Sequence, residues 1–407
     1  MDYCISSNAQ SATLTTLYKL EDTNDYGHRL PVNVRNGSKQ PIAIYPNIAH
    51  ASNYEGKTFT FNIEEAGLLT RIVPYVRLTP LATEAEYDVI KVFSRFASKM
   101  ALRTQNNIIT EIGSEYIQAR LENLPASQCF KMNQLTNPSK TWTANEEVEG
   151  IIPWFSIFTD TVSNALDTKF IKNCQFDIKI NTYEEMGLEI PVGETAPFEA
   201  LEIILYCFYR NLDEKAYVAY KEKRYGTIEN PKEFNMLSYS TYLENYEELL
   251  TGSTSVNLKM KCPFPVSRTH FMIVNPVLNQ GPTTQEISSF SLSFSGRKLY
   301  DNLPMLVLKS DESYLGNTSI RGVTLAGAVS VSPSKGKDIG TINYGEYGTI
   351  HSGNSGSLSF GNVSSPILTI NLPEAAASDA ELRVVHEIFT LLSINPLDGT
   401  ISSGAST

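Results

Sequence analysis

Two consecutive strand patterns within residues 256–302 constrain this chain more than any other stretch. In the second, Phe290, Leu292 and Phe294 alternate with serines, which is the two-residue period of a strand with one buried and one solvated face. The first begins with a similar alternation and ends in an apolar run, Phe271 to Val274, as is typical of a strand buried on both faces. This part of the chain is therefore predicted to be a β-domain.

The N-terminal half contains strand patterns of the same kind. Phe59, Phe61 and Ile63 alternate with polar residues, and with the apolar segment 68–78 they predict a hairpin. Residues 150–158 form a dense apolar strand, and a further alternating strand lies at 175–180. Strands are also expected at 108–112 and 116–121, and longer apolar strands at 201–209 and 381–394.

Two helices are expected between these strands. Thr83 and Glu86 have capping-box spacing, which predicts a helix over about residues 84–97. Asn211 or Asp213 caps a second helix that runs to Tyr225, with Gly226 as its stop. We place the boundary between two domains just after this helix.

The length of 407 residues exceeds what one core usually organises, which predicts two domains. We expect an N-terminal arm at 1–30, a first domain at 31–228, a second at 229–396 and a flexible tail at 397–407. The 21 tyrosines and 18 phenylalanines favour β-structure. The five cysteines are far apart in sequence and are expected to be buried free thiols.

In their order, these segments resemble the double jelly-roll major capsid proteins of the adenovirus, nucleocytoplasmic large DNA virus and tailless membrane-containing phage lineage. That family has a Leu-Pro-x-Trp-Phe strand in its first barrel and an alternating strand ending in Asn-Gly-x-x-Arg/Lys-Phe in its second. Here Ser295 replaces the asparagine, and Phe271 stands where the family often carries tryptophan. The resemblance marks as structural motif residues Pro153, Trp154, Phe155, Phe271, Gly296 and Arg297.

The resemblance implies an all-β fold of two consecutive eight-stranded antiparallel jelly-roll barrels, with short helices in the connections. It further implies a major capsid protein that forms pseudo-hexameric homotrimers, which tile an icosahedral virion shell assembled in the host cytoplasm or nucleus. Expected partners are neighbouring capsomers and penton and minor capsid proteins. An internal membrane is left open as a further partner.

The sequence argues against several other kinds of chemistry. A net charge of −11 without a basic cluster argues against binding of nucleic acid. The five histidines show no H-x-H or H-E-x-x-H spacing, and no P-loop, Rossmann or nucleophile-elbow motif is present. We therefore expect neither enzymatic activity nor a metal or cofactor, and the metal-binding cupin is disfavoured.

Two alternatives remain. The first is a viral spike or carbohydrate-binding β-sandwich that uses exposed loop aromatics, for which Tyr314, Tyr344 and Tyr347 are candidates. The second is a single jelly-roll shell protein of a small virus. Such shells bind their genome through an arginine-rich arm, whereas Lys19 and Arg29 are the only Lys or Arg residues among the first thirty.

Overall fold

β-Strands dominate the part of the chain that the computed structural model describes. These residues are 38–48, 53–83, 92–104, 107–122, 142–155, 165–232, 234–275, 283–308, 338–344, 357–360, 366–376 and 379–404. The expected N-terminal arm, the segments containing Tyr314 and Tyr347, and Cys4 and Cys129 lie outside them. No helix among the described residues is long and apolar enough to cross a membrane.

The first half of the chain forms a sandwich of two antiparallel sheets. One sheet has the order β1-β9-β3-β6 with β7 also on β3, and the other has the order β2-β8-β4-β5. Its strands are β1 (Ser38–Ile44), β2 (Thr58–Asn62), β3 (Leu68–Pro80), β4 (Ala97–Thr104), β5 (Asn107–Gly113), β6 (Val148–Ile151), β7 (Leu166–Asp167), β8 (Cys174–Ile180) and β9 (Phe198–Asn211).

The second half repeats this arrangement. One sheet has the order β10-β20-β13-β14, with β17 and β18 also on β13 and with β11 and β21 on β20, while the other is β12-β19-β15-β16. These strands are β10 (Phe234–Leu243), β11 (Glu247–Glu248), β12 (Ser255–Lys259), β13 (Pro265–Asn275), β14 (Thr283–Gln285), β15 (Ser289–Phe294), β16 (Arg297–Pro304), β17 (Ile339–Asn343), β18 (Leu358–Ser359), β19 (Ile367–Asn371), β20 (Glu381–Ile394) and β21 (Ile401–Gly404).

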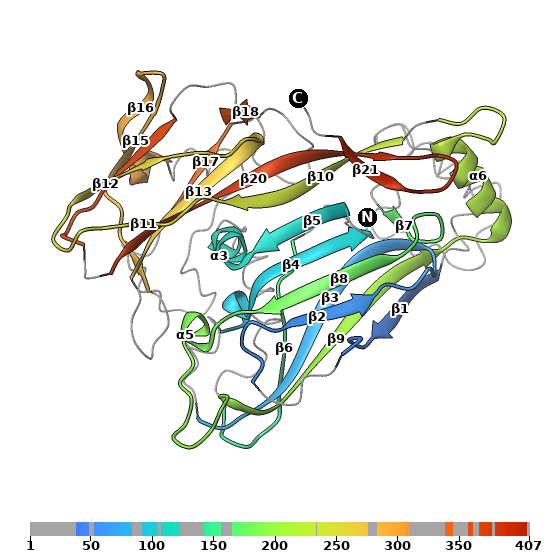
Figure 1. The fold of residues 1–407 in the computed structure, drawn as a ribbon, viewed down its shortest axis with the longest axis horizontal. Coiled ribbons are helices and arrows are strands. Elements are labelled where there is room, and N and C mark those ends of the chain that lie inside the picture. Colours follow the sequence, from blue (N-terminus) through green and yellow to red (C-terminus); the bar gives the residue numbers. More distant parts are fainter. Residues whose placement is uncertain are drawn as a thin grey trace, which may run out of the picture.

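The strand order in both halves is that of a jelly roll. If β1–β6, β8 and β9 are lettered B to I in chain order, the two sheets read B-I-D-G and C-H-E-F. The strands β10, β12, β13, β15, β16, β17, β19 and β20 give the same two orders in the second half. Two consecutive antiparallel jelly rolls therefore make up the fold (Figure 1), as expected from the sequence.

Helices α3 (Ser114–Glu122), α5 (Tyr183–Met186) and α6 (Glu214–Tyr225) lie in the connections of the described part of the chain, together with shorter helical turns at 92–95 and 305–308. The Asp213 carboxylate accepts a hydrogen bond from the backbone N–H of Ala216, and α6 ends at Gly226, which has a φ of 78°. The expected caps of this helix are confirmed. Figure 1 places α3 between the two barrels and α6 at one end of the molecule.

Four expectations about single segments are wrong. Residues 59–78 form no hairpin, because β2 pairs with β8 in one sheet and β3 with β9 in the other. Residues 116–121 belong to helix α3, whose Tyr116 and Ile117 pack in the first barrel's core and whose Ala119 packs against the second barrel. The other two wrong expectations are the C-terminal end of the helix at 84–97 and the flexibility of the tail at 397–407.

The helix expected over 84–97 has its first residues outside the described part of the chain, and its last helical residue is Arg95. Ala97 already begins β4, where Met100 is a core residue of a strand. The C-terminal tail, expected to be flexible over 397–407, is ordered through residue 404. Strand β21 pairs with β20 there, and Ile401 is buried in the first barrel's core. Burial of this apolar side chain is what orders the segment.

Candidate functional site: the interface between the barrels

Strand β10 of the second barrel lies along the edge strand β5 of the first, and hydroxyl groups join them. The Thr110 and Ser238 hydroxyls lie 2.7 Å apart, and Ser238 also donates to the Ile109 carbonyl. The Glu111 N–H donates to the Ser240 hydroxyl at 3.2 Å, and Thr241 donates to the Glu111 carbonyl at 3.3 Å. These bonds satisfy backbone groups that an edge strand would otherwise expose.

Helix α3 makes the apolar part of the interface. Ala119 packs against Met272 and Val274 of β13 and Ile339 of β17, and all four side chains are buried. The small alanine side chain allows the helix to approach the sheet closely. As a consequence β13 is buried on both faces, which explains its continuous apolar sequence.

A buried carboxylate from the second barrel lies beside this helix. Glu387 of β20 accepts hydrogen bonds from the Tyr116 hydroxyl at 3.0 Å and from the Ser267 hydroxyl at 2.9 Å, and Arg268 lies 3.7 Å away. Burial opposes ionisation of Glu387, but Arg268, Arg120 and the two hydroxyls outweigh it and hold its pKa below the ordinary value. A negative charge is thus stabilised between the barrels by Tyr116 and Arg120 of the first barrel and Arg268 of the second.

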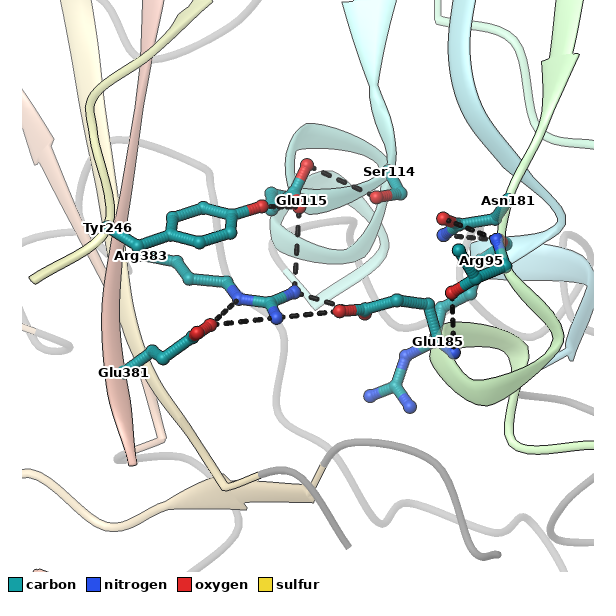
Figure 2. A network of polar contacts seen from close by, with 9 residues as sticks. Arg95, Ser114, Glu115, Asn181, Glu185, Tyr246, Glu381 and Arg383 are labelled. Atoms are coloured by element: carbon teal, nitrogen blue, oxygen red, sulfur yellow. Dashed lines mark hydrogen bonds and ion pairs between the residues drawn. The ribbon is translucent and has the colours of Figure 1, made fainter. Parts of the chain in front are cut away.

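A second polar cluster is centred on Arg383 of β20 (Figure 2). Its guanidinium donates to both carboxylate oxygens of Glu185 at 2.7 and 3.1 Å, and to Glu381 at 3.0 and 3.1 Å. Glu115 of α3 lies 3.6 Å from it, and the Tyr246 ring packs 4.6 Å from its central carbon. Burial lowers the pKa of Arg383, but Glu185, Tyr246 and Glu115 outweigh this and raise it. The guanidinium is therefore charged.

The cluster joins residues that are distant in sequence. Glu115 and Glu185 belong to the first barrel, whereas Tyr246, Glu381 and Arg383 belong to the second. The Tyr246 hydroxyl donates to Glu115 at 2.8 Å, so the carboxylate is held by both a cation and a hydroxyl of the second barrel. Glu185 is positioned by α5, where its backbone N–H donates to the capping hydroxyl of Thr182.

The second barrel's core contains one more buried charged group. Glu244 accepts hydrogen bonds from the backbone N–H groups of Lys261 and Cys262 at 2.7 and 2.8 Å, and the His386 Nε2 lies 3.2 Å from it. Burial raises the pKa of Glu244, but these partners outweigh it and lower the pKa overall. Burial lowers the pKa of His386, with Glu244 acting in the opposite direction. His386 and Glu244 are both buried, so this pair is part of the packing of the second barrel's core.

The described part of the chain offers neither a metal-binding cluster nor an exposed thiol. No group of three or more His, Cys, Asp or Glu residues there could hold a metal ion. Cys174, Cys207 and Cys262 are buried free thiols, and burial raises the pKa of each to about 12. These thiols are protonated at neutral pH and unreactive.

The motif residues of the first barrel lie just beyond β6. Pro153 is buried, while Trp154 and Phe155 are half-buried and pack against the first barrel's core. The Trp154 ring meets Phe176 edge-on at 4.8 Å. The expected strand through residue 158 ends at Ile151, and residues 156–158 lie outside the described part of the chain.

The motif residues of the second barrel occupy a core position and a turn. Phe271 is fully buried against Phe290, and its ring packs over Gly340, where an added Cβ would lie 2.1 Å from the ring. Gly296 and Arg297 are exposed at the β15–β16 turn. The structure keeps Pro153, Trp154 and Phe155 together, whereas Phe271 lies in the core and Gly296 and Arg297 at an exposed turn. None of the six lies among the polar residues of the interface.

The interface itself was not predicted from the sequence. One signal was present, because charged residues interrupt the otherwise apolar strand at Glu381, Arg383 and Glu387. Charges in a strand of this kind are buried only if they are paired. The partners Glu115 and Glu185 lie far away in the sequence, and no pattern indicated them.

A search of protein families and a search of curated proteins found no match to this chain. Solved structures do match. The PBCV-1 protein VP54, as fitted into a reconstruction of the virophage Sputnik, has a TM-score of 0.67 at 12% identity and covers 91% of this chain and 98% of that chain. The Faustovirus major capsid protein has a TM-score of 0.60 at 9% identity and covers 95% and 98%. The chain thus has the double jelly-roll fold of these proteins.

Proposed function

We propose that this protein is a major capsid protein, a non-enzymatic structural subunit of an icosahedral virion shell. The observation that carries the proposal is the extent of the structural likeness, which covers 91% of this chain and 98% of the PBCV-1 protein. The described residues of this chain form two consecutive jelly rolls, and the likeness extends over both of them.

In the proposed assembly the subunit is a homotrimer. Three chains of two barrels give six lobes, a pseudo-hexagonal unit that tiles a shell together with penton and minor capsid proteins. We retain residues 31–228 and 229–396 as the two barrels, and the six motif residues as positions that the fold depends on. The ion clusters around Arg383 and Glu387 support this function, because tiling needs a fixed angle between the lobes.

The binding-module alternative loses one of its candidate residues. Tyr344 is half-buried, its ring packs 5.8 Å from Phe360, and its hydroxyl lies 3.0 Å from that of Thr269. This tyrosine is a packing residue, so it is not available to stack on a ligand. The earlier expectation that it lies in an exposed loop is wrong.

The test is the mass of the purified protein by light scattering at micromolar concentration, followed by electron microscopy of the particles. We expect a stable trimer with a three-lobed or hexagonal outline. An obligate interface of this kind buries about 2,000 Å² or more. A monomer that stays monomeric as the concentration rises would contradict the proposal.

A further inference from the structure

The outer face of the sheet β1-β9-β3-β6 is apolar, although it lies on the outside of the molecule. Alternate residues of β9 face the core, so Tyr206 and Phe208 face outward, and the register places them opposite Val73 and Arg71 of β3. Tyr75 packs edge-on against Tyr206 at 5.9 Å. We call this surface the outer apolar face, and it consists of Pro41, Ala43, Val73, Tyr75, Tyr206 and Phe208.

Charged residues surround this face rather than interrupt it. Arg71 lies 5.8 Å from the Phe208 ring, and Arg77 pairs with Glu147 at 3.3 Å and Glu202 at 3.4 Å. An apolar centre with a polar rim is the usual anatomy of a protein–protein interface.

The second barrel indicates what covers such a face. Its equivalent sheet, β10-β20-β13-β17, is covered on its outer side, where Met272 and Val274 contact Ala119 and the charged side chains of Arg268, Arg383 and Glu387 also lie. There the covering elements are the edge strand β5 and the helix α3 that directly follows it, both from the first barrel. In the first barrel the equivalent sheet has no such cover from the described part of the chain.

The second barrel carries an equivalent of β5 and α3. Strand β16 occupies the place of β5 in the jelly roll, and helical residues 305–308 follow it directly. Met305 and Leu308 anchor this turn in the second barrel's core, while Leu306 is 70% exposed. Leu299 of β16 is also exposed, at 53%. We call β16 with residues 305–308 the second-barrel edge.

We propose that the outer apolar face receives the second-barrel edge of another copy of this chain. The contact repeats between chains the interface that joins the two barrels within a chain. The inference rests on the proposed function and names the surfaces that the trimer would use. Because the two surfaces differ, the contact is head-to-tail, and a rotation of one third of a turn between copies closes such a contact into a trimeric ring.

Two single substitutions test this proposal, Ala43→Glu on the outer apolar face and Leu306→Glu on the second-barrel edge. Both side chains are exposed, so a charge disturbs no contact within the folded chain. We expect each variant to be monomeric by light scattering, with the circular dichroism spectrum of the wild type. Ile228→Glu, at a side chain 91% exposed and distant from both surfaces in the sequence, is the control and should remain trimeric. Pro41→Glu replaces Ala43→Glu should that variant fail to fold.

Mixing the two monomeric variants tests the head-to-tail geometry. The Ala43→Glu chain retains an intact second-barrel edge, and the Leu306→Glu chain retains an intact outer apolar face. We expect the mixture to form a dimer that cannot close into a trimer. A mixture that stays monomeric, or variants that stay trimeric, would overturn the assignment of these surfaces. A monomeric wild type would instead overturn the proposed function.

Discussion

At the scale of single residues, His386 links the stability of the second barrel to pH. The ring is fully buried, with Thr269 on one nitrogen, Glu244 on the other, and the rings of Tyr242 and Phe360 against it. Burial lowers the pKa of His386 below its ordinary value. The unfolded chain therefore binds more protons at this site than the folded chain at a pH just below the ordinary histidine pKa, which is about 6.5.

This sign leads to a prediction for acid unfolding. The stabilising contribution of neutral His386 is present above about pH 6.5 and is lost as the pH falls, with a slope of at most about 1.4 kcal/mol per pH unit for one proton. A second loss follows at lower pH, because the pKa values of Glu244 and Glu387 are also lowered. Denaturant titrations between pH 8 and 5 measure the slope. His386→Gln, which does not titrate, should reduce it, and an unchanged slope would contradict this account.

At the scale of elements, the turn between β15 and β16 follows from backbone conformation. Ser295 and Gly296 have φ values of 49° and 78°, and the strands pair from Phe294 and Arg297. Two central residues with positive φ form the type I′ turn, which matches the twist of the strands and favours Asn-Gly. The serine in this turn therefore adopts a conformation that asparagine adopts more readily.

Substitutions in this turn should have opposite effects. An added Cβ at Gly296 would meet nothing within 4 Å, so Gly296→Ala changes only the backbone preference. We expect it to destabilise the protein by about 1 kcal/mol, whereas Ser295→Asn should stabilise it by about 0.5 kcal/mol. Thermal or chemical denaturation of both variants measures this pair. Equal signs for the two changes would exclude backbone conformation as the cause.

Elements whose pattern is set by their own barrel were predictable from the sequence. The alternation of Phe176, Ile178 and Ile180 gives the buried face of β8, and the caps of α6 gave both of its ends. Elements whose burial depends on the other barrel were not. The second barrel covers the face of helix α3 that carries Ala119. Without the second barrel this face would be exposed to solvent, so its burial could not be read from the sequence and the helix was mistaken for a strand. The hairpin expected at 59–78 failed because the connection passes from one sheet to the other.

At the scale of the whole molecule, the second half of the chain contributes residues to the core of the first barrel. Val385, Leu392, Ile394 and Ile401 belong to the second half of the chain but pack in the hydrophobic cluster of the first barrel. The buried charges of Glu387 and Arg383 also depend on the first barrel for their partners. Separating the barrels would expose these apolar side chains and leave Glu115 without its cation.

We therefore expect the chain to unfold in a single transition, although it contains two jelly rolls. Calorimetry of the Ala43→Glu chain tests this without the added coupling of a trimer, and the calorimetric and van't Hoff enthalpies should agree. Arg383→Ala leaves the buried Glu115 carboxylate without its cation and should cost about 3 kcal/mol. Arg77→Ala removes an ion pair whose side chains are 43% to 63% exposed, and it should cost less than about 1 kcal/mol. Two separate transitions in the Arg383→Ala chain alone would identify this residue as the coupling between the barrels. Two transitions in the parent chain would show instead that each barrel folds alone, because the contacts between the barrels would then contribute less than either barrel's own core.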